Sequence, residues 1–270
     1  MRPIVSILMT AYNREFFISM AIESVLNSTF KDFELIIVDD CSTDATVAIA
    51  RKYEKLDSRI KLFVNEHNLG DYDNRNFAAS VARGKYIKYV DSDDILYKFS
   101  LEIMIEAMEL NPDAGFGLSA IGNKLRAYPI CISPMQAYEE HFNGFGHFDR
   151  APGSVIIRKK AFDEIGGFKS KKYIGDVELW FLMAQKFNVV LFQRDLLWDR
   201  VHAQSEMAYE RIQPNMNKLR KNLVLSMLQS NDCPLRKEQI QIIKKDIRKK
   251  DIRNNILLIF KRLFYPLKSL

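Results

Sequence analysis

The sequence predicts an α/β fold with a mostly parallel central sheet flanked by helices. Four short apolar segments, typical of strands covered on both faces, alternate with segments whose apolar residues recur at helical spacing. This alternation favours a parallel sheet, because each helix carries the chain back to the start of the next strand. Polar residues also gather where these strands end, and ligands bind at that edge in open sheets of this class.

The elements follow from the same periodicities. The four strands that define the sheet are predicted at 3–9, 33–38, 60–64 and 85–90. Helices are predicted at 17–26, 45–56, 73–81 and 101–110, the last of them stopped by Asn111-Pro112. Further strands are predicted at 114–120, 153–158, 189–192 and 196–198, and a further helix begins at or near residue 176. We interpret residues 122–146, which are rich in aromatic side chains, as irregular.

Composition and cysteine spacing exclude several classes of protein. Hydrophobic residues make up 47% of the chain, so it is globular, but no apolar run approaches the ~20 residues that span a bilayer. The N-terminus shows no signal-peptide pattern. The three cysteines lie far apart and form no Cys-x-x-Cys pair, which indicates neither a zinc site nor a disulfide framework. These observations predict a cytoplasmic protein.

Charge divides the chain into a body and a tail. Residues 210–270 contain 15 Lys and Arg against 5 Asp and Glu, whereas residues 1–209 carry a net charge of about −4. Isoleucines interleaved with the basic residues are typical of an amphipathic helix that lies on an anionic membrane surface. The alternative is a helical pair that packs on the body or on a second copy of the chain. No recognition motif accompanies the charge, so nucleic acid is not expected as a partner.

The strongest chemical signal follows the strand at 85–90. Asp91, Asp93 and Asp94 place three carboxylates within four positions. So much negative charge at a strand end is unfavourable without a cation. Carboxylate oxygens suit Mg²⁺ or Mn²⁺, and Mg²⁺ fills its other positions with water and substrate phosphates. The pattern therefore predicts a metal clamp for a diphosphate; the alternative is a polar turn that caps the next helix.

Several segments together carry a family resemblance. They are residues 5–13, residues 33–42, Asn68-Leu69-Gly70 with Arg75-Asn76, and residues 82–94. In order and spacing they resemble the nucleotide-sugar half of a family 2 glycosyltransferase of GT-A fold, over about the first 95 residues and more weakly to about residue 205. The resemblance implies a metal-dependent, inverting transfer from a nucleotide-diphosphate sugar. It also implies a catalytic domain over 1–209, with a donor half over 1–95 and an acceptor half over 96–209, followed by the basic helical tail over 210–270.

The resemblance implies a set of nucleotide-sugar-binding residues. They are Thr10, Ala11, Tyr12, Arg14, Asp39, Asp40, Arg75, Asp91 and Ser92. Thr10 and Tyr12 would line the nucleoside pocket, with Tyr12 against the base, although a turn hydroxyl and a packed aromatic ring are the alternatives. Asp40 would accept a hydrogen bond from the base, whereas Asp39 is better suited to support the strand end. Arg75, and more weakly Arg14, would approach the diphosphate, because guanidinium donors match phosphate oxygens.

The resemblance also implies a metal site and a catalytic base. Asp93 would ligate the metal, and Asp91 would face the ribose or a metal-bound water. His202 would complete the metal shell or bond the diphosphate, and the alternative is a structural histidine. An inverting transfer needs a carboxylate beside the acceptor hydroxyl. The resemblance places this base at Asp176, after Gly175; the alternatives are that Asp176 only caps a helix, or that Glu178 is the base.

We therefore predict a hexosyltransferase-like enzyme that uses Mg²⁺ or Mn²⁺. It would move a sugar from a UDP- or dTDP-type donor to a hydroxyl of a saccharide or lipid-linked saccharide in surface-polysaccharide assembly. It would be peripheral on the inner face of the cell membrane through its tail, and a homo-oligomer is compatible with the sequence. One alternative is a polyprenyl-phosphate glycosyltransferase, whose ionised acceptor needs no strong base. The other is a non-catalytic nucleotide-sugar-binding subunit.

Overall fold

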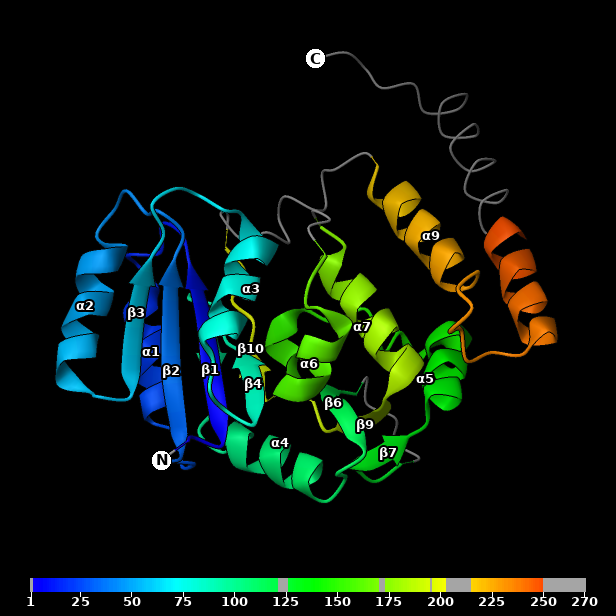
Figure 1. The fold of residues 1–270 in the computed structure, drawn as a ribbon, viewed down its shortest axis with the longest axis horizontal. Helices are drawn as coiled ribbons and strands as arrows, with labels where there is room; N and C mark the ends of the chain where they lie inside the picture. Colours follow the sequence, from blue (N-terminus) through cyan, green and yellow to red (C-terminus); the bar gives the residue numbers. More distant parts are fainter. Residues whose placement is uncertain (1, 121–125, 170–172, 195, 203–214, 250–270) are drawn as a thin grey trace, which may run out of the picture.

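The computed structural model describes residues 2–120, 126–169, 173–194, 196–202 and 215–249. Its central sheet consists of the strands β1 (Val5–Ala11), β2 (Phe33–Asp39), β3 (Ile60–Val64), β4 (Tyr86–Tyr89), β6 (Ala114–Ser119), β7 (Ile130–Ile132), β8 (Val155–Arg158) and β9 (Asn188–Phe192). They lie in the order β3-β2-β1-β4-β8-β6-β9-β7 (Figure 1). The first four are parallel to one another, and β6 is parallel to β9. The predicted mostly parallel α/β sheet is confirmed; β8 and β7 are its antiparallel members.

Helices cover both faces of this sheet. On one face lie α1 (Ile18–Leu26), α2 (Thr46–Leu56) and α4 (Ser100–Glu109). On the other lie α3 (Asp71–Val81), α5 (Pro134–Glu140), α6 (Lys159–Ile165), α7 (Gly175–Lys186) and α9 (Met216–Met227). Strand β2 shows why such strands are apolar throughout: Leu35 and Ile37 enter one core, and Ile36 and Val38 enter the other.

The prediction that residues 122–146 are irregular is wrong for most of the described part of that range. The segment contains β7, α5 and a short π-helix, η1 (His141–Phe145). The side chain of Ser133 accepts a hydrogen bond from the backbone N–H of Gln136, and Pro134 occupies the first turn of α5. Both features signal the start of a helix, but the prediction gave more weight to the aromatic content of the segment. Tyr138 of α5 is fully buried in the core.

The described part of the tail packs on the body. Leu223 and Met227 of α9 are 4% and 8% exposed, and Figure 1 shows α9 beside α7, away from β2 and β3. A further helix spans residues 237–249, and its Ile243 packs against the same core. This arrangement agrees with the helical-pair interpretation for these residues; residues 250–270 lie outside the described ranges. Within those ranges, no helix combines the length and the apolar character needed to cross a bilayer.

A small two-stranded sheet connects the predicted metal-clamp residues to a distant part of the chain. Strand β5 (Ile95–Leu96) pairs with β10 (Leu197–Trp198) in antiparallel orientation. The acidic residues before β5 are therefore brought beside the segment that ends at His202.

His141 in η1 should make the fold sensitive to acid. Its ring stacks on Phe148 with centroids 4.7 Å apart and contacts the ring of Phe181. Burial, with the nearby His147 adding to it, lowers the pKa of His141 from 6.5 to about 3. As pH falls below 6.5, the unfolded chain therefore binds a proton that the folded chain does not. This group alone should lower the free energy of unfolding by about 2 kcal/mol between pH 7 and pH 5.

Urea unfolding of His141→Gln at pH 7 and pH 5 tests this expectation. The variant should lose less stability over that interval than the wild-type protein does. His67→Gln, which changes an exposed histidine, is the matched control and should follow the wild type. The same pH dependence in wild type and His141→Gln would contradict the prediction.

Candidate active site

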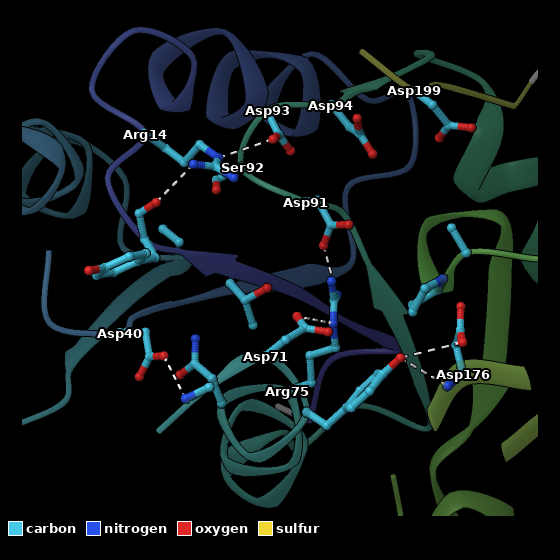
Figure 2. A pocket seen from close by; sticks show the side chains of 18 of the residues that line it. Arg14, Asp40, Asp71, Arg75, Asp91, Ser92, Asp93, Asp94, Asp176 and Asp199 are labelled. Carbon is cyan, nitrogen blue, oxygen red and sulfur yellow. Dashed lines mark hydrogen bonds and ion pairs between the residues drawn. The ribbon is translucent and has the colours of Figure 1, made fainter. Parts of the chain in front are cut away.

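A cavity of about 490 Å³ opens at the carboxyl ends of β1, β2 and β4. The residues that line it are Thr10, Ala11, Tyr12, Arg14, Asp40, Asn68, Gly70, Asp71, Tyr72, Asn74, Arg75, Asp91, Ser92, Asp93, Asp94, Ala151, Pro152, Asp176, Asp199 and Arg200. Figure 2 shows the acidic side chains around the cavity, with Asp93 and Asp94 at the top, Asp40 at the lower left and Asp176 at the right. The fold thus brings together residues from both predicted halves of the chain.

The cavity is rich in negative charge. Seven aspartates and three arginines line it. Burial, with Asp91 and then Asp93 and Asp199 adding to it, raises the pKa of Asp94 to about 8. Asp94 is therefore mostly protonated at pH 7. The ionised carboxylates of the cavity repel a bare diphosphate, so an anionic ligand needs additional positive charge there.

Arg75 of α3 holds two of the aspartates. Its Nε donates to Asp71 at 2.8 Å and its Nη1 donates to Asp91 at 2.7 Å. Burial disfavours the charged form of Arg75, but the carboxylates of Asp71 and Asp91 raise the pKa of Arg75 well above its usual value. Arg75 is only 5% exposed. In this structure it therefore fixes Asp91 at the cavity wall in addition to lining the cavity.

Replacing Arg75 with methionine should destabilise the fold. The change leaves the partly exposed carboxylates of Asp71 and Asp91 facing each other without a cation. We therefore expect the free energy of unfolding to fall by about 3 kcal/mol, the low end for a broken buried pair. Arg51→Met is the matched control, because Arg51 pairs with Glu54 on the surface at 47% exposure and should lose no more than about 0.5 kcal/mol. Urea unfolding at pH 7 measures both variants. Equal losses in the free energy of unfolding would contradict a structural role for the buried Arg75.

Asp93 lies at the centre of a second set of contacts. Its Oδ2 accepts a hydrogen bond from Arg14 Nε at 3.0 Å and lies 2.9 Å from Nε2 of His202. The His202 ring packs on Phe17 with centroids 4.5 Å apart. Arg200 donates from Nε to the backbone carbonyl of Asp93, and its backbone N–H donates to Asp94. The predicted metal residue and His202 are therefore neighbours.

These residues fit a divalent cation of the Mg²⁺ or Mn²⁺ class. Among the described residues, no three His, Cys, Asp or Glu side chains form a ready-made metal cage. A cage is not required, because Mg²⁺ binds through one or two carboxylates together with water and substrate phosphates. Asp93 and Asp91 supply such carboxylates, in a cavity whose acidic lining favours a cation. His202 is placed to contribute or to orient Asp93.

Asp40, predicted to bind the nucleotide base, and Asp39, predicted to support the strand end, occupy different environments. Asp40 lines the cavity, but its carboxylate already accepts hydrogen bonds from the backbone N–H groups of Leu69 and Gly70, at 2.8 and 2.9 Å. Gly70 has φ +87°, a conformation that glycine adopts without strain. Asp39 is fully buried, does not line the cavity and accepts from the backbone and hydroxyl of Ser42. It has the supporting contacts expected of a strand-end residue.

The other residues that the family resemblance assigned to the donor site also line the cavity. Thr10 and Ala11 are the last two residues of β1, and Tyr12 follows them. All three line the cavity, and Tyr12 is 47% exposed. Ser92 is buried in the cavity wall.

Asp176 lies in the first turn of α7 and lines the cavity. Its Oδ1 accepts a hydrogen bond from the backbone N–H of Val177 at 2.7 Å and lies 3.4 Å from the hydroxyl of Tyr72. Glu178 does not line the cavity and is only 4% exposed. Of the two predicted base candidates, only Asp176 lines the cavity.

The lining residues to which sequence reasoning gave no site role include Asp71, Tyr72, Asp199 and Arg200. Asp71 and Tyr72 stand one turn before Arg75 on the same helix, and Asp199 and Arg200 directly precede His202 within the segment that was compared with the family. The available signal was that these residues lie close in sequence to predicted site residues. Sequence proximity alone does not tell which neighbours line the cavity.

Comparison of the sequence with known proteins identifies relatives of this chain. A model of the family described as "Glycosyl transferase family 2" matches residues 6–166. The chain is 42% identical over 107 residues to the putative teichuronic acid biosynthesis glycosyltransferase TuaG of Bacillus subtilis, covering 40% of this chain and 42% of TuaG. It is 43% identical over 108 residues to the UDP-Glc:alpha-D-GlcNAc-diphosphoundecaprenol beta-1,3-glucosyltransferase WfgD of Escherichia coli, covering 40% of this chain and 42% of WfgD. The matched segments thus span less than half of each relative.

A solved structure agrees with the fold over nearly the whole chain. The structure of S. aureus TarS 1–349 in complex with UDP-GlcNAc superposes with a TM-score of 0.72, covering 98% of this chain and 76% of that one, at 19% sequence identity. At this identity the likeness is one of fold, and it agrees with the predicted GT-A architecture. Because the family model matches more than half of the residues, the chain belongs to glycosyl transferase family 2.

Proposed function

We propose that this protein is a metal-dependent, inverting glycosyltransferase that uses a UDP- or dTDP-sugar. The observation that carries the proposal is the position of Asp176, which lines the same cavity as Asp91 and Asp93 although it comes from the other half of the chain. A carboxylate for the acceptor and an acidic loop for a cation and diphosphate are the groups that such a transfer requires.

In the proposed reaction Asp176 takes the proton from an acceptor hydroxyl as its oxygen attacks the anomeric carbon. Attack from the face opposite the leaving nucleotide inverts the configuration, and no side chain becomes glycosylated. Mg²⁺ or Mn²⁺, when bound through Asp93 and Asp91, would offset the negative charge of the diphosphate. Arg14 and Arg200, which contact Asp93, add positive charge at the same side of the cavity.

We propose a lipid-linked saccharide as the acceptor, in the assembly of a cell-surface polysaccharide. Support comes from the relatives, since TuaG is named for teichuronic acid biosynthesis and WfgD for a GlcNAc-diphosphoundecaprenol acceptor. The test incubates the protein with Mn²⁺, a UDP- or dTDP-sugar and a synthetic lipid diphosphate that carries N-acetylglucosamine. An α-linked donor should give a β-linked product by NMR, and an α-linked product would contradict inversion. Binding of the donor without transfer would favour a non-catalytic subunit.

We further propose that the protein is cytoplasmic and acts at the inner face of the membrane. The exposed side of the helix at 237–249 carries Lys245 and Arg248, and anionic headgroups attract such residues by about 1 kcal/mol each. Replacing both with glutamate should weaken co-sedimentation with phosphatidylglycerol vesicles by tenfold or more. The matched control is the same double charge reversal at Arg51 and Lys52, exposed residues of α2. Equal effects of the two double variants would contradict a specific role for the tail.

A further inference from the structure

Tyr72 of α3 spans the boundary between the two halves of the site. Its ring stacks on Phe168, with centroids 5.2 Å apart and planes inclined by 20°. Phe168 is itself held by α3, because Asn76 donates to its carbonyl at 2.8 Å and accepts from its N–H at 2.9 Å. The same helix therefore carries Arg75, which fixes Asp91, and Tyr72, which reaches toward the first turn of α7.

The hydroxyl group of Tyr72 lies beside Asp176. It accepts hydrogen bonds from the backbone N–H groups of Gly175 and Asp176, at 3.1 and 3.4 Å. These donors occupy its lone pairs, so its single proton is available for Oδ1 of Asp176, 3.4 Å away. Burial, with the charge of Asp176 adding to it, raises the pKa of Tyr72, so the phenol stays protonated and remains a donor.

Gly175 makes this approach feasible. A Cβ at position 175 would lie 2.7 Å from one carbon of the Tyr72 ring and 2.9 Å from two others, distances that real Cβ atoms do not show. The aromatic ring thus lies directly against the backbone at the start of α7. The absence of a side chain at Gly175 leaves the space that the Tyr72 ring occupies.

We propose that Tyr72 is a positioning residue for the catalytic base, holding the Asp176 carboxylate toward the cavity and favouring its ionised form. This inference rests on the proposed function, in which Asp176 is the base. Tyr72 touches neither reacting atom in this role and acts through Asp176 alone. A hydrogen bond from a neutral phenol stabilises a carboxylate more than a carboxylic acid, so its loss makes the base harder to ionise.

The direct test is the titration of the Asp176 carboxyl group in the full chain. The protein is labelled with [4-¹³C]aspartate, and the Asp176→Asn spectrum identifies the signal. In Tyr72→Phe the titration midpoint should move to higher pH by on the order of half a unit or more. Tyr53→Phe is the matched control, because Tyr53 donates to the Glu23 carboxylate outside the cavity, and it should leave the midpoint unchanged.

Gly175→Ala provides a second variant should Tyr72→Phe fold poorly. Its Cβ displaces the ring and should move the midpoint in the same direction, although the phenol is still present. A midpoint that stays at the wild-type value in both variants, or in whichever of them folds, would overturn the positioning role. This readout does not require a known acceptor.

Kinetics separate this inference from the proposed function. With UDP-glucose and a synthetic lipid-diphosphate-linked N-acetylglucosamine, Tyr72→Phe should lower kcat about tenfold, leave KM for the donor within twofold and move the acidic limb of the pH profile upward. Full activity in Asp176→Asn would refute the base itself. If Asp176→Asn loses activity while Tyr72→Phe keeps the wild-type kcat and pH profile, only the proposed role of Tyr72 is refuted. If wild type does not turn over these probes, the titration decides.

Discussion

Asp176→Asn should lower the rate of sugar transfer by about a thousandfold while nucleotide binding is retained. A positioned general base contributes about 10²–10⁴ to the rate, and asparagine cannot take a proton. The amide keeps the size of the carboxylate and can still accept the hydrogen bond from Val177, so the first turn of α7 should be preserved. The measurement is nucleotide diphosphate released per minute from the donor in the presence of Mn²⁺ and the lipid-linked acceptor.

Glu178→Gln is the control for this result. Glu178 lies on the same helix, two residues further on, but it is buried and does not line the cavity. Its substitution should leave the rate within a few-fold of wild type. Full activity in Asp176→Asn would favour a polyprenyl-phosphate acceptor, which is ionised before it reacts. Inactivity of Glu178→Gln with full activity of Asp176→Asn would reverse the assignment of the base.

Asp93→Asn should abolish the metal-dependent part of nucleotide binding. A ligand present at a hundredfold excess over its dissociation constant stabilises a protein by about 2.7 kcal/mol. We expect UDP or dTDP with Mn²⁺ to give stabilisation of this order in wild type and to give almost none in Asp93→Asn. The physical reason is that Asp93, in the proposed function, supplies a carboxylate for the cation; without the cation the diphosphate would be repelled by the acidic lining of the cavity.

The experiment is a thermal-shift titration of both proteins with and without Mn²⁺. Asp113→Asn, which removes an exposed carboxylate between α4 and β6, is the matched control and should respond as wild type does. An undiminished Mn²⁺-dependent shift in Asp93→Asn would show that another group binds the cation, and Asp91 would then be the first candidate.

Much of the donor half was predictable because the apolar pattern of each strand agrees with the parallel sheet that the strands form together. Strands such as β2 are buried on both faces, so their apolar runs were unambiguous, and parallel pairing brings their polar ends to one edge. Asp93 and His202, 109 residues apart in the chain, were assigned to one site by family resemblance and lie 2.9 Å apart.

The contacts between side chains were not predictable from the pattern. Asp40 was assigned to the nucleotide base, and it also holds the loop at Leu69 and Gly70, which depends on a turn that periodicity does not reveal. Tyr72 reads as an ordinary helix residue, and its contact with Asp176 arises only when segments 104 residues apart are packed together. The prediction of irregular structure at the start of α5 is wrong although Ser133 and Pro134 signal a helix there, because aromatic content alone does not distinguish a loop from a helix.

The most direct test of the proposed function is a thermal-shift screen of the wild-type protein against UDP, dTDP, GDP and CDP, each with and without Mn²⁺. A shift with UDP or dTDP that requires Mn²⁺ is the predicted result, and it would establish the cavity as a metal-dependent nucleotide site. The absence of a shift with every nucleotide, with or without the metal, would contradict the proposed transferase.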